Sequence, residues 1–379
     1  MKKITFNKPY INYENYFRNL KKLKNFNHYS KHGFFCHKCS DFLIKKLKVK
    51  KVLMTQSCTS ALEMCAILLD IKKNDEIIFP SYSYVTTVSS FVSRGAKPIF
   101  IDIDKNSLCL NIKDLKKKIT NKTKAVVVTN YAGGSCDMNE LKKLKRKFNF
   151  FLIEDNAQAL FSTFNNKFLG TFGDLSTISF HETKNIHCGE GGALIINNKK
   201  FIKRSEIVLH KGTNRVLFNK QIINRYSWVD IGSSFGLSEI HASLLFNNLK
   251  NFKNIFNIRK KIWENYHIKF KSLEINGLIK RPWFNKKVKQ NYHMYYLLVK
   301  PSIRNKLIKF LSDYKIQASF HYLPLHNSIF YKKNYKKKLF FKNSQDISNQ
   351  IIRLPLSNEL KKKDSDYVIK KVYNFFKKI

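Results

Sequence analysis

The stretch FLIEDNAQALFSTFNNKFLGTFGDLSTISFHETKNIHCGEGG, residues 151–192, decides the fold and the chemistry expected of this chain. It begins with an apolar run that ends in two acids, Glu154 and Asp155. A second strand-like run, residues 175–180, leads to Lys184 and then to a cluster of glycines. A carboxylate at the end of one strand and an amine just beyond another suit chemistry that needs a fixed negative charge and a nucleophile.

Strand-like and helical patterns alternate on both sides of this stretch. The strand candidates are residues 52–55, 76–79, 98–101, 125–130, 150–154, 175–180 and 193–197. Helical patterns lie between most of them, at residues 85–93, 113–119, 139–148 and 200–210. Apolar, β-branched strands that alternate with helices predict a mainly parallel sheet covered on both faces.

The alternation stops near residue 249. A long helical pattern at residues 251–270 is followed by a strand-like run at 294–299 and a final helix at 365–376. We therefore expect a large α/β domain over residues 1–248 and a smaller α+β domain over residues 249–379. The Lys-rich and aromatic segment at residues 331–342 is expected to be a mobile surface loop.

Small polar residues follow the strand candidate at residues 52–55. They stand at the entrance of a helical pattern, where free N–H groups and the helix dipole favour an anion, and they are Ser57, Cys58, Thr59 and Ser60. An ordinary Ser/Thr helix cap explains the same pattern, so the residues alone leave both interpretations open.

The composition restricts the class of protein. With 379 residues, 43% of them hydrophobic, the chain is long enough for two domains and a sizeable core. The net charge of +45 comes from scattered lysines without a nucleic-acid-binding motif, so we expect no nucleic-acid partner. No apolar signal region or run of roughly 18 apolar residues is present, which predicts a cytoplasmic protein without membrane insertion.

The seven cysteines show no spacing typical of a disulfide scaffold. Cys36 and Cys39 form an isolated C-x-x-C pair without a second pair of ligands, so neither a zinc site nor a redox site is expected.

The motifs ED-x-A-Q, S-F-H-x-x-K-N and G-E-G-G occur in this order within residues 154–192, and similarity extends over nearly the whole chain. The chain resembles the DegT/DnrJ/EryC1/StrS sugar aminotransferases, which have the fold-type I architecture of pyridoxal phosphate (PLP) enzymes. The resemblance implies a large domain with a mainly parallel seven-stranded sheet between helices and a smaller C-terminal α+β domain. Within this group, SFHETKN with GEGG is most similar to the dTDP-4-amino-4,6-dideoxygalactose transaminases of surface-polysaccharide synthesis.

The resemblance also assigns roles to residues of the site. Lys184 would hold the cofactor covalently and carry protons, and Asp155 would face the protonated pyridine nitrogen. The remaining cofactor contacts are Cys58 and Thr59 at the phosphate, Tyr84 stacked on the ring, Gln158 near the phenolic oxygen and Ser179 at the phosphate. The implied substrates are L-glutamate and a nucleotide-linked 4-keto sugar, and the family uses no metal.

The stretch from Tyr226 to Leu245 matches a contact between subunits in the family. Its Ser234 stands where many relatives have an asparagine that reaches the phosphate of the other subunit's cofactor, which implies a homodimer with shared active sites. Gly236 stands where those relatives have an arginine, so the group that binds the glutamate carboxylate is open, with Arg215 and Arg225 as candidates.

Three other functions would account for part of this pattern. A 3-aminotransferase of the same fold typically has Y-P-G-K-N-L-G-A around its lysine, which this chain lacks, and a PLP-dependent sugar dehydratase has histidine where this chain has Lys184. A nucleic-acid binder would explain the charge but not the ordered motifs.

Overall fold

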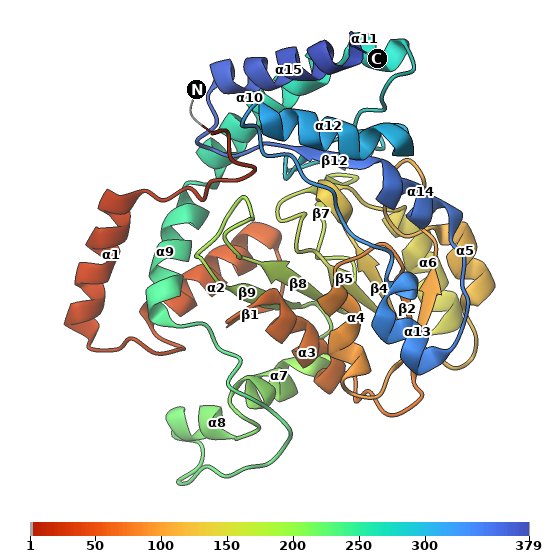
Figure 1. The fold of residues 1–379 in the computed structure, drawn as a ribbon. Helices are drawn as coiled ribbons and strands as arrows, with labels where there is room; N and C mark the ends of the chain where they lie inside the picture. The colour runs from red at the N-terminus through yellow and green to blue at the C-terminus, as the bar shows by residue number, and fades with distance from the viewer. Residues whose placement is uncertain (1–2, 379) are drawn as a thin grey trace.

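The computed structural model describes residues 3–378, and Figure 1 shows them as a sheet covered by helices with a smaller group of helices above it. The large sheet has seven strands in the order β1 (Lys51–Thr55), β9 (Gly192–Ile196), β8 (Leu175–Ser179), β5 (Phe151–Asp155), β4 (Thr123–Thr129), β2 (Glu76–Pro80) and β3 (Lys97–Ile101). In this sheet β9 pairs antiparallel with both of its neighbours, β1 and β8, and the pairs among β8, β5, β4, β2 and β3 are parallel. The predicted mainly parallel, seven-stranded fold is confirmed.

Helices bury both faces of this sheet because successive side chains of a strand point to opposite sides. On β4, Ala125 and Val127 face one core, and Val126 and Val128 face another. The first face is covered by α3 (Cys58–Leu68), α4 (Val85–Val92) and α7 (Ile202–Leu209). The second is covered by α2 (Phe34–Leu47), α5 (Ile112–Lys118), α6 (Met138–Phe148) and α9 (Glu239–Lys250).

A smaller layer lies above the carboxyl ends of the parallel strands. Its two-stranded sheet pairs β11 (Tyr295–Leu298) antiparallel with β12 (Ile351–Leu354). The helices packed on one face of it are α10 (Phe252–Lys269), α12 (Pro301–Asp313) and α15 (Lys362–Phe376). Ile4 also packs in this core, and its backbone pairs with Lys315 and Gln317. We therefore propose that the chain passes from the large domain to the smaller one near residue 249, and that its first residues fold onto the smaller layer.

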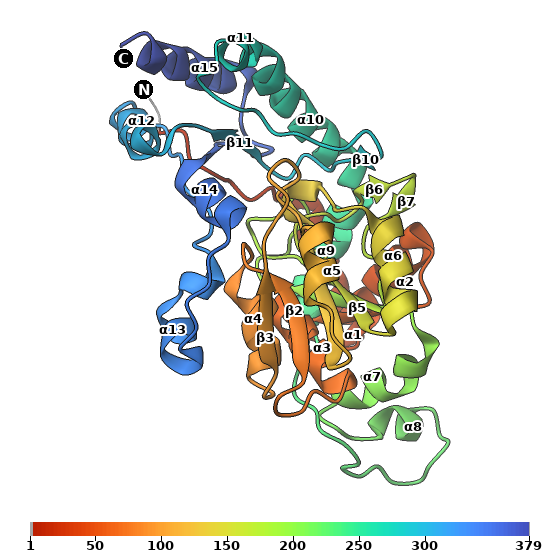
Figure 2. The same cartoon turned by 90° about the vertical axis from the view of Figure 1, so that its right-hand side faces the viewer.

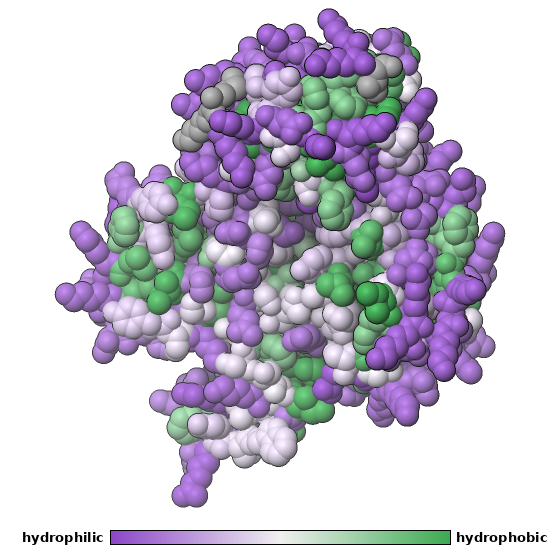
Figure 3. Space-filling model, viewed as in Figure 1, coloured by the Kyte–Doolittle hydropathy of each residue, from purple (hydrophilic) through white to green (hydrophobic). Residues whose placement is uncertain are grey.

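The remaining elements connect or flank these layers. They are α1 (Tyr13–Phe26), α8 (Arg215–Asn219), α11 (Lys271–Ile275), α13 (Ile329–Tyr335), α14 (Lys342–Gln350), and the short strands β6 (Thr163–Phe164), β7 (Lys167–Phe168) and β10 (Val288–Lys289). Figure 3 shows hydrophilic side chains over most of one face, with apolar ones gathered over α1 at its left. None of the helices within residues 3–378 is long and apolar enough to cross a bilayer.

The segment expected to be a mobile loop at residues 331–342 is instead partly helical. In α13, Tyr331 is buried, and its ring packs edge-on against Phe100 with the centroids 5.0 Å apart. Figure 2 shows α13 returning from the smaller layer to the side of β3. The aromatic residues of this segment, which contributed to the prediction of a mobile loop, therefore anchor it to the edge of the large sheet.

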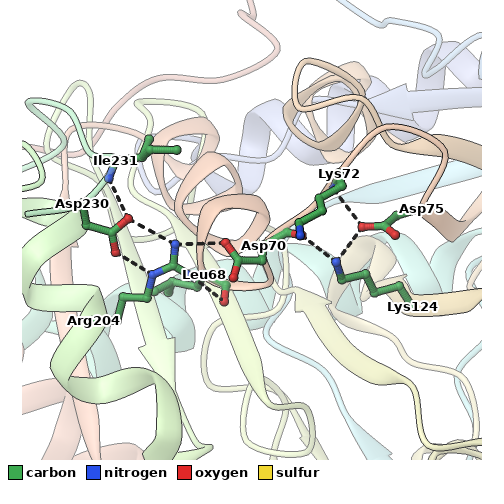
Figure 4. Close-up of polar contacts among 8 residues, drawn as sticks. All are labelled: Leu68, Asp70, Lys72, Asp75, Lys124, Arg204, Asp230 and Ile231. Atoms are coloured by element: carbon green, nitrogen blue, oxygen red, sulfur yellow. Dashed lines mark hydrogen bonds and ion pairs between the residues drawn. The ribbon is translucent and has the colours of Figure 1, made fainter.

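A network of charged side chains fastens the base of the loop between α7 and α9, and Figure 4 shows it. Arg204 of α7 donates from Nε to Asp230 Oδ2 at 2.7 Å and from Nη2 to Asp70 Oδ1 at 3.1 Å. Next to it, Lys124 Nζ lies 2.6 Å from Asp75 Oδ2 and also donates to the Asp70 carbonyl. The network ties Asp230 to the body of the large sheet, whereas α8, farther along the same loop, projects away from it (Figures 1 and 2).

Candidate active site

A cavity of about 640 Å³ lies where the large sheet meets the smaller layer. Its wall contains Cys58, Thr59, Tyr84, Asp155, Gln158, Ser179 and Lys184. The structure thus brings together all but one of the site residues expected from the sequence. The exception is Ser234, which is exposed outside the cavity and accepts a hydrogen bond from Lys31 Nζ at 2.9 Å.

Lys184 stands on a tight loop that follows β8. Phe180 N–H donates to the Gly191 carbonyl at 2.8 Å, and Cys188 N–H donates back to the Phe180 carbonyl at 2.9 Å, which closes the loop. Gly189 has a φ of +84°, a conformation that side chains with a Cβ rarely adopt. The G-E-G-G motif therefore serves the geometry of the loop that presents the lysine.

Burial lowers the pKa of the Lys184 ammonium, and the charge of Arg353 lowers it further. Asp155 and Cys58 act in the opposite direction. Among residues 3–378, Lys184 Nζ has no hydrogen-bond or ion-pair partner. An amine in this state exchanges protons near neutral pH more readily than a solvated lysine.

Asp155 ends β5 and is 4% exposed. Its Oδ2 accepts a hydrogen bond from Thr87 Oγ1 at 2.6 Å, and its Oδ1 accepts one from the Ala157 N–H at 3.2 Å. Burial raises the pKa of the Asp155 carboxyl, while these two donors and Lys184 lower it. The site therefore holds a carboxylate that lacks full solvation and gains from a cationic partner in the cavity.

Glu154, the other acid of the motif, points away from the cavity. Its carboxylate accepts three backbone N–H groups at 2.7 Å each, those of Gly170, Phe172 and Gly173. It fixes the turn that leads into β8. The two neighbouring acids thus have separate tasks because successive side chains of a strand face opposite sides.

The amino end of α3 forms another part of the wall. Ser57 caps the helix by accepting the Ser60 N–H at 3.0 Å, and Cys58 and Thr59 begin its first turn. Cys58 has no positive φ, so a cysteine is compatible with this position. Its thiol stays protonated because burial raises its pKa to about 12.

Gly192 brings this helix end next to the lysine loop. A Cβ at Gly192 would lie 2.3 Å from the Ser57 carbonyl carbon and 2.5 Å from Cys58 N. Only glycine permits this approach of β9 to α3, and it sets an anion-binding helix end beside Lys184.

Tyr84 and Gln158 occupy the side of the cavity below the smaller layer. Tyr84 directly precedes α4 and is 54% exposed, with its ring centroid 6.0 Å from that of Tyr322. Gln158 accepts the Ala132 N–H at 2.8 Å and donates to Tyr322 Oη at 2.9 Å. Ser179 Oγ accepts the His181 N–H at 3.4 Å.

The smaller layer adds residues that the motif reasoning missed. They are Arg259, His293, His321, Tyr322 and Arg353. Burial lowers the pKa of His293 and His321, so both imidazoles are neutral. A single arginine inside the apolar run IIRLPL was the available signal for Arg353. The two arginines suggested by the sequence, Arg215 and Arg225, do not line the cavity.

The residues present fit pyridoxal phosphate. The cavity combines an amine of lowered pKa, a buried carboxylate and a helix amino end, which match an aldehyde, a pyridine nitrogen and a phosphate. In addition, the hydroxyl of Thr129 is buried in the cavity wall without a hydrogen-bond partner among the described residues. A polar ligand at this place would satisfy it.

Comparisons with known proteins agree with this geometry. The model of the DegT/DnrJ/EryC1/StrS aminotransferase family matches residues 12–373. The chain is 34% identical to the uncharacterized protein MJ1066 of Methanocaldococcus jannaschii over 87% of this chain and 86% of that protein. It is 29% identical to the GDP-perosamine synthase of Escherichia coli O157:H7 over 92% of both chains.

The fold also matches the solved structure of Helicobacter pylori PseC, an aminotransferase involved in the biosynthesis of pseudoaminic acid. The TM-score is 0.92 at 25% identity, and the match covers 100% of each chain. The chain therefore belongs to the DegT/DnrJ/EryC1/StrS aminotransferase family of sugar aminotransferases and uses pyridoxal phosphate as its cofactor.

Proposed function

We propose that the enzyme transfers an amino group from L-glutamate to C4 of a nucleotide-linked 4-keto-6-deoxyhexose. The specific reaction proposed is conversion of dTDP-4-dehydro-6-deoxyglucose to dTDP-4-amino-4,6-dideoxygalactose, for a surface polysaccharide such as lipopolysaccharide or enterobacterial common antigen. The observation that carries the proposal is the presence of Lys184 and Asp155 on the wall of one cavity. The choice of sugar is supported by the SFHETKN and GEGG motifs.

When bound, pyridoxal phosphate supplies an electron sink that stabilises the carbanion formed at the carbon bearing the amine. Lys184 is the residue that holds the cofactor and then, as a free amine, takes the proton from the α-carbon of glutamate. In the second half-reaction Lys184 returns a proton to C4 of the sugar. The lowered pKa of this lysine supports its role as a base, because the neutral amine accepts the proton, and the ammonium formed in this way is the acid that returns a proton.

Asp155 holds the proton on the pyridine nitrogen of the cofactor. Thr87 and Ala157 orient its carboxylate by two hydrogen bonds, and burial strengthens its attraction to the pyridinium. The amino end of α3, with Thr59 and Ser179, is proposed to bind the phosphate. Tyr84 is proposed to cover one face of the ring.

We also propose that two chains form a homodimer with shared active sites. The loop between α7 and α9 exposes large apolar side chains, with Trp228 80% exposed and Ile222 64% exposed. Monomers rarely leave such residues uncovered in one segment. Ser234 lies at the base of this loop, outside its own cavity, and is proposed to contact the cofactor phosphate of the partner subunit.

The test begins with the purified protein, which should absorb visible light as a cofactor–lysine adduct. Borohydride reduction followed by peptide mass spectrometry should place the cofactor on Lys184, and Lys184→Ala should abolish turnover. A colourless protein that takes up no cofactor, or normal turnover by the variant, would reject the assignment.

Substrate identity requires a panel of dTDP-, GDP- and UDP-linked 4-keto sugars with L-glutamate, followed by identification of the epimer formed. The alternative is another sugar nucleotide aminotransferase of the same family, with a different nucleotide, position or epimer. The likeness to a GDP-perosamine synthase favours testing GDP-linked sugars first among these. Higher kcat/KM for a GDP sugar than for the dTDP sugar would replace the specific proposal.

A further inference from the structure

Arg353 is placed in the cavity by the alternation of a strand. In β12, Ile352 and Leu354 point into the core of the smaller layer, and Ile351 points into the core beneath the large sheet. Arg353 lies on the same side as Ile351, where the strand faces the large domain. At this position its guanidinium lines the cavity that contains Lys184.

The guanidinium of Arg353 is held in a fixed orientation. Its Nη2 and Nε donate to the Phe320 carbonyl at 3.1 and 3.3 Å. Its Cζ lies 4.6 Å from the centroid of the Phe6 ring. Phe6 itself is pinned to the smaller layer, because its N–H donates to Gln317 Oε1 and its carbonyl accepts the Leu356 N–H.

No acid balances this charge. Among residues 3–378, Arg353 has no ion pair with an aspartate or glutamate, and burial lowers its pKa. The phenols Tyr82, Tyr131 and Tyr322 lie near it, and burial raises their pKa values so that they remain neutral. The other ionisable groups that its charge affects, Lys184, His293 and His321, are bases. A largely buried cation without a counter-ion is costly, and an anionic ligand would remove that cost.

Arg259, the other arginine of the cavity wall, has a different role. Its Nε and Nη2 donate to the carbonyls of Tyr292 and His293 at 3.0 and 2.6 Å, and only 3% of the residue is exposed. These bonds fix the chain beside His293. Arg353 also donates from Nε and Nη2 to a carbonyl, but to a single one, and its side chain is only partly buried. Arg353 is therefore the arginine that is more accessible to a ligand in the cavity.

We propose that Arg353 binds the α-carboxylate of the amino donor. This inference rests on the proposed aminotransferase function. In an amino acid the α-carboxylate is attached to the carbon that loses its proton to Lys184, so its binding group must face the same space as the lysine. Arg353 meets this requirement, since Arg353 and Lys184 line the same cavity. A planar, pre-oriented guanidinium binds a carboxylate in a bidentate manner.

The diphosphate of a sugar nucleotide is the competing anion. It is attached at C1, on the far side of the sugar ring from C4, and so lies farther from Lys184 when C4 reacts. Binding of the amino-donor carboxylate and binding of the sugar-nucleotide diphosphate can be distinguished, because the two halves of the reaction can be measured independently with the cofactor-loaded enzyme.

The experiment compares Arg353→Gln and Arg353→Lys with the wild type. In the glutamate half-reaction, followed by the cofactor absorbance, we expect KM to rise about 100-fold for Arg353→Gln and less for Arg353→Lys. In the sugar half-reaction we expect KM to change less than about twofold. The affinity of Arg353→Gln for 2-oxoglutarate, measured by calorimetry, should fall by a factor similar to the rise in KM for glutamate.

Arg304→Gln is the matched control. Arg304 also lies against Phe320, with its Cζ 5.8 Å from the ring centroid, but it is not part of the cavity wall. Arg304→Gln should therefore leave both half-reactions unchanged. A larger effect of Arg353→Gln on the sugar half-reaction would assign the arginine to the diphosphate, and unchanged 2-oxoglutarate binding would overturn the proposal outright. Failure of the proposed function itself would differ, because the wild type would then show no glutamate half-reaction.

Discussion

Thr87→Val tests how the site controls its carboxylate. The substitution keeps the shape of a fully buried side chain but removes the hydroxyl that donates to Asp155 Oδ2 at 2.6 Å. A hydrogen bond to a charged group contributes about 1.5–3 kcal/mol. Because 1.36 kcal/mol corresponds to one pKa unit, the pKa of Asp155 should rise by about 1–2 units.

The sign of the pH effect follows from this shift. Asp155 acts as a carboxylate, and its pKa is already raised by burial. A further rise protonates it over a wider acid range, so the acid limb of the pH–kcat profile of Thr87→Val should move to higher pH. The same loss should weaken cofactor binding by about 10-fold or more, since each 1.4 kcal/mol is a factor of ten.

The assays are a titration of cofactor-free protein with pyridoxal phosphate and a pH–rate profile. Thr87→Ser should restore both properties because it restores the donor. Ser90→Ala is the matched control, since Ser90 lies on the same helix with a buried hydroxyl that has no hydrogen-bond partner among the described residues. Wild-type cofactor affinity and an unshifted acid limb in Thr87→Val would refute the reasoning.

Two further predictions concern the scaffold of the site. Glu154→Gln leaves one of three backbone N–H groups without its carboxylate acceptor, so the free energy of unfolding should fall by about 2–3 kcal/mol in urea titrations. The control variant, Glu14→Gln, changes an exposed residue and should have no effect, and equal stability of both variants would contradict the prediction. Gly192→Ala places a Cβ 2.3 Å from the backbone of Ser57, so cofactor affinity should fall more than about 10-fold. Gly189→Ala has open space around its Cβ, so it should cost only about 1–2 kcal/mol of backbone strain and retain the cofactor. Full cofactor retention by Gly192→Ala would show that α3 can move away from β9.

The residues of the site that could be predicted from the sequence are those near strand ends. Asp155 and Lys184 follow apolar runs that are recognisable as strands, and their flanking motifs are local. The helix entrance at Cys58 and Thr59 is likewise a local pattern of small polar residues. Such patterns survive in the sequence because backbone conformation and strand-end position depend on neighbouring residues.

The separate roles of Glu154 and Asp155 could be explained only from the structure. Adjacent residues of a strand point to opposite faces, but a sequence does not state which face meets a cavity. The partner of Asp155, Thr87, comes from the amino end of α4, and this pairing depends on how α4 packs against the sheet.

By itself the sequence determined that the chain forms a covered, mainly parallel sheet carrying one lysine and one acid at strand ends, because periodicity and turn chemistry are local properties. Only the tertiary structure decided that β9 lies between β1 and β8, that the first residues of the chain join the smaller layer, and that Arg353 lines the same cavity as Lys184. The physical reason is that these pairings join distant segments. Arg353, one of 71 basic residues, becomes distinctive only when folding places it, partly exposed and without an acid partner among residues 3–378, on the wall of the cavity.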